Sequence, residues 1–137
     1  MHAAAQENKS VPVNKQSILL SIEKQEKELV HISDQVWSFA EIAMKEHQSA
    51  KVLSAYAEQK GFKVTRNVAD IPTAFIAEYG SGKPIIGILG EFDALPGLSQ
   101  KAMPSKEALN AGAAGHGCGH NMFGAASLGA AVAIKEL

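Results

Sequence analysis

Residues 85–93 have the sequence Ile85-Ile86-Gly87-Ile88-Leu89-Gly90-Glu91-Phe92-Asp93. The first five residues are apolar apart from one glycine, which is typical of a central strand covered on both faces. Ligand sites in open α/β sheets gather beyond the carboxyl ends of the strands. We therefore expect Glu91 and Asp93 to lie near a site, where a carboxylate could orient a metal-bound imidazole. A pair of solvated loop acids is the alternative that this segment alone leaves open.

The sequence on either side of this segment predicts helices, strands and one long loop. Apolar residues recur at helical spacing over residues 16–43 and 48–60, and Gly61 is expected to end the second helix. Residues 62–66 and 73–79 have strand patterns, with a turn at 70–72 and a hairpin connection at 80–84. Residues 94–115 form a long connection, and residues 120–137 a small-residue helix suited to close packing on a sheet. This order predicts a layered α/β domain with helices on the sheet faces.

The composition is that of an ordinary globular chain: 137 residues, 46% of them hydrophobic and 20% charged, with a net charge of -1. The chain lacks the basic stripe typical of nucleic-acid-binding modules. It also lacks the run of about 20 apolar residues that a membrane span needs. We interpret residues 1–15 as a flexible leader and residues 16–137 as the domain. A cytoplasmic location is expected, with export to the periplasm as the alternative if the start lies within a signal peptide.

The strongest chemical signal is Gly115-His116-Gly117-Cys118-Gly119-His120-Asn121. Three side chains that can bind metal alternate with glycines, which permit tight turns and close approach of the backbone to a ligand. In an extended or looped backbone, positions 116, 118 and 120 would project to one side. Thiolate and imidazole groups suit zinc and comparable divalent ions. The alternative is a glycine-rich loop with incidental histidines.

Cys118 is the single cysteine, so the chain cannot form an internal disulfide. A different enzyme class therefore stays open, a thiol hydrolase with Cys118 as nucleophile and His116 or His120 as base. A third hypothesis is a non-catalytic metal-binding or interaction module.

Taken together, Gly90–Gln100 and Gly115–Asn121 resemble the amidohydrolase branch of the aminoacylase/carboxypeptidase metallopeptidases, and residues 61–68 and 71–77 are similar to the same branch. The resemblance covers about residues 30–137. It implies that the chain is the truncated N-terminal part of a three-layer αβα catalytic domain. The rest of the catalytic domain and a dimerisation domain would then be absent.

The resemblance also implies roles for individual residues. Cys118 and His120 would bind the metal, His116 would line the pocket, and Asp93 would support the metal site from behind its ligands. The wider family has a metal-binding histidine where this sequence has Glu91, so Glu91 is placed in the pocket and its role as a ligand is in question. The general-base glutamate of the family is expected beyond the end of the chain.

The activity implied is hydrolysis of the amide bond of an N-acyl or N-aroyl amino acid, such as an aminobenzoyl-glutamate, by metal-activated water. One or two zinc or manganese ions would serve as cofactor. The full-length protein would be a dimer, for which a related subunit is one candidate partner, and neither nucleic acid nor membrane is an expected partner. We expect the 137-residue chain to be inactive on its own.

Overall fold

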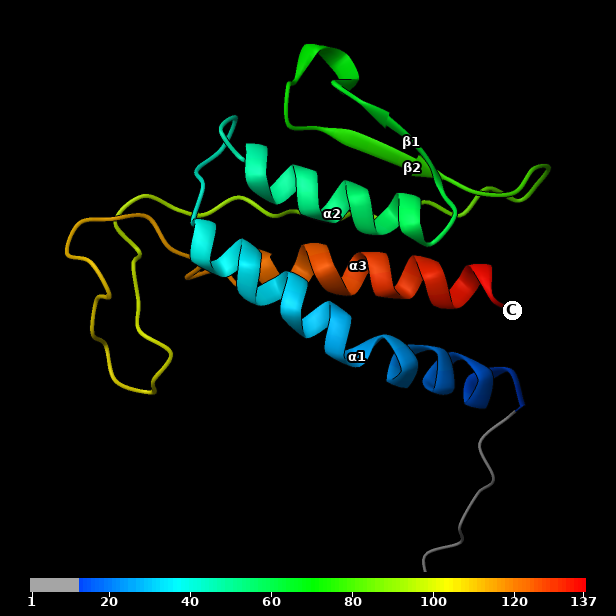
Figure 1. Cartoon of the computed structure of the whole chain (residues 1–137), viewed down its shortest axis with the longest axis horizontal. Helices are drawn as coiled ribbons and strands as arrows, with labels where there is room; N and C mark the ends of the chain where they lie inside the picture. The colour runs from blue at the N-terminus through cyan, green and yellow to red at the C-terminus, as the bar shows by residue number, and fades with distance from the viewer. Residues whose placement is uncertain (1–12) are drawn as a thin grey trace, which may run out of the picture.

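The computed structural model describes residues 13–137, in which three helices pack with a small two-stranded sheet (Figure 1). The elements, in chain order, are α1 (Val13–Phe39), α2 (His47–Gln59), β1 (Lys63–Arg66), a short 3-10 helix η1 (Val68–Asp70), β2 (Phe75–Glu78) and α3 (His120–Lys135). The expected mixed α/β class is confirmed. The predicted leader lies outside the described residues except for positions 13–15, which belong to α1.

Helices α1 and α3 lie side by side, and α2 lies between them and the β1–β2 hairpin (Figure 1). The core is formed where the apolar faces of the helices meet; its buried members are Ile32, Val36, Leu53, Tyr56, Ala125 and Val132. A Cβ atom added at Gly129 of α3 would lie 2.6 Å from the Leu29 side chain of α1. The small residues of α3 therefore allow close packing on α1, whereas the sequence predicted close packing on a sheet.

Helix α2 ends as its sequence predicts. Gly61 has a φ of +83°. Its N–H donates to the Glu58 carbonyl, and the N–H of Phe62 donates to the Ala57 carbonyl. This pair of bonds is the Schellman motif, in which a left-handed residue satisfies the last helical carbonyls. The reversal directs the chain straight into β1.

Strands β1 and β2 pair antiparallel, with Lys63 opposite Glu78 and Arg66 opposite Phe75. The predicted strands at 62–66 and 73–79 are therefore confirmed, with shorter bounds. The turn expected at 70–72 begins earlier, in η1. The rings of Phe75 and Phe92 stack with their centroids 6.0 Å apart. This contact brings β2 close to the segment that carries Glu91 and Asp93.

The prediction of a central strand at residues 85–89 was wrong. This segment runs extended behind α2 (Figure 1), but it belongs to no strand, and the connection at 80–84 closes no hairpin. The apolar run indicated burial on both faces. A strand also needs a hydrogen-bonded neighbour, however, and the described residues place none beside this segment.

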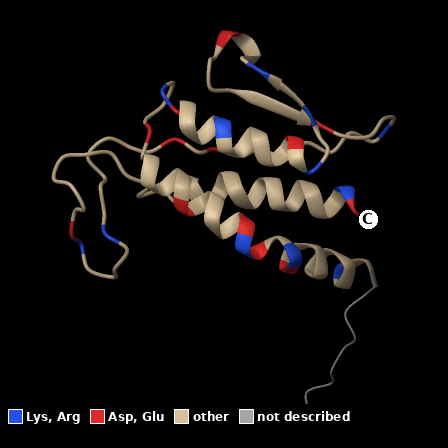
Figure 2. Cartoon of the chain, viewed as in Figure 1, with Lys and Arg blue, Asp and Glu red and all other residues tan. Residues whose placement is uncertain are grey.

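Residues 94–115 form the expected long connection. Its two ends are joined, because Leu95 and Gly115 each donate an N–H to the carbonyl of the other. Acidic and basic residues are interspersed along the described chain (Figure 2). Among the described residues, none of the helices has the length and hydropathy needed to cross a lipid bilayer.

Candidate metal centre

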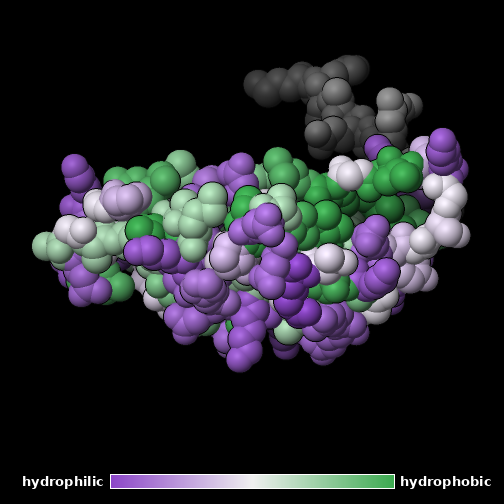
Figure 3. Space-filling model, turned by 90° about the horizontal axis from the view of Figure 1, so that it is seen from above, coloured by the Kyte–Doolittle hydropathy of each residue, from purple (hydrophilic) through white to green (hydrophobic). Residues whose placement is uncertain are grey.

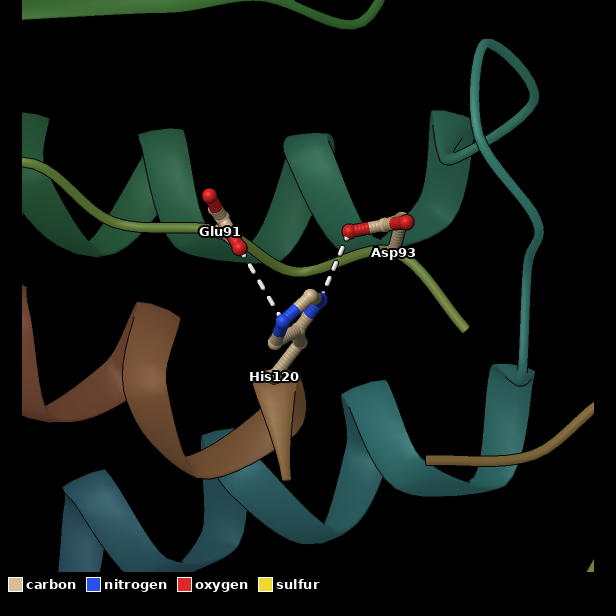
Figure 4. Close-up of side chains that lie close together, drawn as sticks. All are labelled: Glu91, Asp93 and His120. Atoms are coloured by element: carbon tan, nitrogen blue, oxygen red, sulfur yellow. Dashed lines mark hydrogen bonds and ion pairs between the residues drawn. The ribbon is translucent and has the colours of Figure 1, made fainter. Parts of the chain in front are cut away.

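The candidate centre lies where α3 begins beside the segment that carries Glu91 and Asp93 (Figure 4). His120 is the first residue of α3, and the preceding Gly119 has a φ of +79°. The N–H of Ala94 donates to the Glu41 carbonyl at 2.7 Å and anchors the segment after Asp93. Small residues of α3 allow the close approach, since a Cβ added at Gly124 would lie 3.1 Å from the Glu91 carbonyl oxygen.

The imidazole of His120 lies between two carboxylates. Its Nδ1 is 2.8 Å from Oδ1 of Asp93, and its Nε2 is 3.0 Å from Oε2 of Glu91 (Figure 4). The His120 side chain is 20% exposed, and those of Asp93 and Glu91 are 26% and 49% exposed. The ring is thus shielded, while Glu91 reaches the surface.

One ligand atom from each of Glu91, Asp93 and His120 lies within 4.8 Å of the other two. An imidazole with carboxylates is a donor set that zinc and manganese accept. A histidine that binds a metal through one ring nitrogen commonly donates its other N–H to a carboxylate. Asp93 at Nδ1 matches that supporting role, and the opposite nitrogen, Nε2, faces Glu91. The residues present therefore fit a divalent ion.

Cys118 lies outside this group of three and its side chain is exposed. The chain turns just before it, because the N–H of Gly119 donates to the His116 carbonyl at 2.9 Å. The sequence suggested that positions 116, 118 and 120 project to one side. The structure instead brings only His120 of the three to the carboxylates, since the turn and the start of α3 separate their directions.

His116 is directed toward α1. Its Nε2 lies 3.0 Å from the Val36 carbonyl oxygen, and because a carbonyl only accepts hydrogen bonds, this nitrogen carries a proton. Its Nδ1 is buried and has no hydrogen-bond partner among the described residues. Burial holds the pKa of His116 below its ordinary value, although the hydrogen bond to Val36 acts in the opposite direction. His116 is thus a fixed ring with one free buried lone pair.

The glycines of the motif are required by packing. A Cβ added at Gly115 would lie 2.2 Å from the Leu98 carbonyl oxygen, and one added at Gly117 would lie 2.8 Å from the Leu98 side chain. The sequence predicted close approach of the backbone to a ligand at these glycines. In the structure, the approach is to another part of the chain.

Sequence reasoning missed two supports of the site. The Asn121 amide donates to the Ser33 hydroxyl at 3.0 Å and ties the start of α3 to α1, and the Val36 carbonyl holds His116. Asn121 is part of the motif and could have been singled out. Its partner, 88 residues away in the sequence, carries no signal of its own.

Comparison with known proteins identifies two relatives of this chain. No family model matches the chain. Over 117 residues, 85% of this chain, it is 47% identical to a p-aminobenzoyl-glutamate hydrolase subunit of Escherichia coli (strain K12). This chain is related to the amidohydrolases. Over 116 residues, 75% of this chain, it is 32% identical to the human Xaa-Arg dipeptidase.

These matches confirm the resemblance to the amidohydrolase branch. The chain spans only about a quarter of the length of the curated relatives it matches, 24% of the bacterial protein and 22% of the human one. Both relatives are named for cleaving an amide or peptide bond.

Proposed function

We propose that this chain supplies part of the metal centre of an amidohydrolase that cleaves an N-acyl or N-aroyl amino acid. The observation that carries the proposal is His120 held between Asp93 and Glu91, in a chain related to hydrolases of aminobenzoyl-glutamate and of dipeptides. A bound divalent ion would polarise the scissile carbonyl and lower the pKa of a water molecule.

Each side chain has a distinct part in the proposed centre. His120 would bind the ion through Nε2, and Asp93 would accept a hydrogen bond from the Nδ1 N–H, which sets the tautomer and orientation of the ring. Cys118, two residues before His120, lies outside this group of three in the structure, and its exposed side chain would have to turn toward Nε2 to supply a thiolate ligand. Glu91 offers a carboxylate oxygen on the Nε2 side. Zinc and manganese are the ions proposed, singly or as a pair.

His116 lines the proposed pocket and does not act as a base. Its Nε2 is held by Val36, and burial disfavours its protonated form. The remaining lone pair of the ring, on Nδ1, is buried and has no hydrogen-bond partner among the described residues. A general base is not among the residues we assign, so we expect the 137-residue chain alone to bind metal without turning over substrate.

The thiol hydrolase alternative has less support. Cys118 would need an imidazole to take its proton. His116 is engaged with the Val36 carbonyl and His120 with two carboxylates. Among the described residues, neither ring is hydrogen-bonded to the Cys118 thiol, and the lone pair left on His116 Nδ1 is buried.

A hybrid protein tests the proposed function. In the Escherichia coli relative, the region matched by this chain is replaced with residues of this chain, and hydrolysis of p-aminobenzoyl-glutamate and of dipeptides is measured with added zinc or manganese. We expect turnover by the hybrid, lost on His120→Ala and retained with His31→Ala, a change at an exposed α1 histidine. A folded hybrid that hydrolyses none of these amides, or one whose activity survives His120→Ala, would contradict the proposal.

A further inference from the structure

Glu41 lies in the loop between α1 and α2 and makes contacts in two directions. Its carboxylate is held by the first turn of α2. Oε1 accepts the N–H of Gln48 at 3.0 Å, and Oε2 accepts the N–H and the hydroxyl of Ser49, each at 2.9 Å. Backbone N–H groups in the first turn of a helix have no partner within the helix. The Glu41 side chain therefore fixes the loop to α2.

The main chain of Glu41 is fixed to the segment that carries Asp93. Its carbonyl accepts the N–H of Ala94 at 2.7 Å, and Ile42 forms an isolated parallel bridge with the same alanine. Ala94 is only 1% exposed, and a buried N–H without an acceptor is costly. The loop is therefore the support of the residue that directly follows Asp93.

The loop needs such tethers to keep its path. Ala40 and Met44 have φ angles of +46° and +67°, a left-handed conformation that residues with a Cβ rarely adopt and that persists only when the surroundings hold it. Glu46 holds one side of the loop, because its Oε1 accepts the N–H of Met44 at 3.0 Å. The bonds from Glu41 to α2 hold the part of the loop that contacts Ala94.

We propose that Glu41 is a positioning residue for the candidate metal centre. The contacts run from α2 through the Glu41 carboxylate and carbonyl to Ala94, and from the adjacent Asp93 to Nδ1 of His120 at 2.8 Å (Figure 4). A weaker hold on Glu41 releases the loop and lets the Asp93 carboxylate shift. The His120 ring is then less well oriented, which lowers metal affinity. This last step rests on the proposed function, whereas the link from Glu41 to Asp93 does not.

Amide hydrogen exchange of the metal-free chain tests that link. Glu41→Gln keeps the shape of the side chain but replaces one acceptor oxygen with a donor. We expect the Ala94 amide to exchange at least about tenfold faster in this variant. The Phe62 amide, which donates to the Ala57 carbonyl at the far end of α2, should exchange at its original rate. Unchanged exchange at Ala94, or equal acceleration at both amides, would overturn the proposal.

Zinc affinity, measured by competition with a chelating dye, tests the consequence for the centre. We expect Glu41→Gln to bind about tenfold more weakly, at the lower end of the effect of losing a supporting carboxylate. Ser49→Ala removes one donor to the same carboxylate and should weaken binding less. Tyr56→Phe is the matched control, because it removes a buried hydrogen bond to Gln25 without touching the loop. Unchanged affinity in Glu41→Gln, or an equal loss in Tyr56→Phe, would overturn the proposal.

The Nδ1 proton of His120 provides a readout that a general loss of stability does not move. Its NMR signal lies far downfield while a carboxylate accepts the hydrogen bond, so we expect an upfield shift in Glu41→Gln and none in Tyr56→Phe. Hydrophobic residues gather along one side of the molecule in the view of Figure 3, and such a surface favours self-association. All variants are therefore compared at one dilute concentration at which sedimentation velocity detects a single species.

The same measurements separate this proposal from the proposed function. An unmodified chain that binds no zinc would contradict the proposed function, and exchange at Ala94 and the His120 signal of the metal-free chain would still decide the role of Glu41. Zinc binding that is lost in His120→Ala but unchanged in Glu41→Gln would leave the proposed centre in place and overturn the positioning role.

Discussion

The Nδ1 atom of His120 lies 2.8 Å from Oδ1 of Asp93. A carboxylate in this position fixes the proton on Nδ1 and directs Nε2 outward, which is how proteins prepare a histidine to bind a metal. On the opposite side of the ring, Nε2 lies 3.0 Å from Oε2 of Glu91. The contact with Asp93 therefore marks Nδ1 as the nitrogen that orients the ring, which leaves Nε2 as the nitrogen that could bind a metal.

Replacing Asp93 with asparagine should weaken metal binding without unfolding the chain. Loss of such a supporting carboxylate commonly lowers metal affinity by about 10–100-fold. Zinc affinity of Asp93→Asn, measured by competition with a chelating dye, checks this. Asp34→Asn, on an exposed part of α1, is the control and should leave the affinity unchanged. Equal affinities of the two variants would contradict the supporting role.

The proposed thiolate ligand predicts a spectroscopic signature. Cobalt(II) bound by a thiolate shows a strong charge-transfer absorption, and binding of the thiolate releases a proton, so the band should fade at lower pH. We expect this band in the 137-residue chain and its loss in Cys118→Ser. A cobalt complex without the band would contradict Cys118 as a ligand.

Gly115 should be among the least replaceable residues of the motif. An added Cβ would lie 2.2 Å from a backbone oxygen of Leu98, which cannot move without breaking the contact between the ends of the long connection. We expect Gly115→Ala to lower the free energy of unfolding by about 3 kcal/mol. The comparison is Gly87→Ala, where a Cβ meets open space and the change should stay within about 1 kcal/mol. Urea denaturation measures both, and equal effects would contradict this account of the motif.

Glu41 should stabilise the start of α2 in a pH-dependent way. Burial by itself raises the pKa of this carboxyl, but hydrogen bonds from Ser49 and Gln48 outweigh it, so the pKa lies below its ordinary value of 4.5. A depressed carboxyl pKa gives stability that is fully present above the ordinary value and is lost as pH falls through the lowered one.

We therefore expect Glu41→Ala to cost about 1 kcal/mol of unfolding free energy near neutral pH, as loss of a helix cap does. This difference from the unmodified chain should shrink as the pH falls below 4.5. Denaturation at a series of pH values measures it. Glu23→Ala, on the exposed side of α1, serves as control. A difference that stays constant into acid would show that the ionised carboxylate is not responsible.

The helices and the hairpin could be predicted because their signals are local. Periodicity located α1 and α2, and Gly61 marked the end of α2. Residues 85–89 show the limit of this reasoning. Their apolar character indicates that something must cover them, but a strand exists only with a partner, and a run of five residues does not say where the partner lies.

The candidate site could be predicted in part, because its residues belong to two local sequence motifs. The two motifs identified Glu91, Asp93 and His120, whose contacts join positions 27 and 29 residues apart in the sequence. The turn at His116–Gly119 separates Cys118 from the group, and alternation of residue types could not reveal it. The hold of the Val36 carbonyl on His116, across 80 residues, depends on how α1 packs.

The most direct test of the proposed centre is a calorimetric titration of zinc or manganese into the 137-residue chain and its His120→Ala variant, with His31→Ala as control. Because His120 is the ring that both carboxylates contact, its removal should abolish measurable binding, while the control should bind as the unmodified chain does. Unchanged stoichiometry and affinity in His120→Ala would contradict a metal centre at this site.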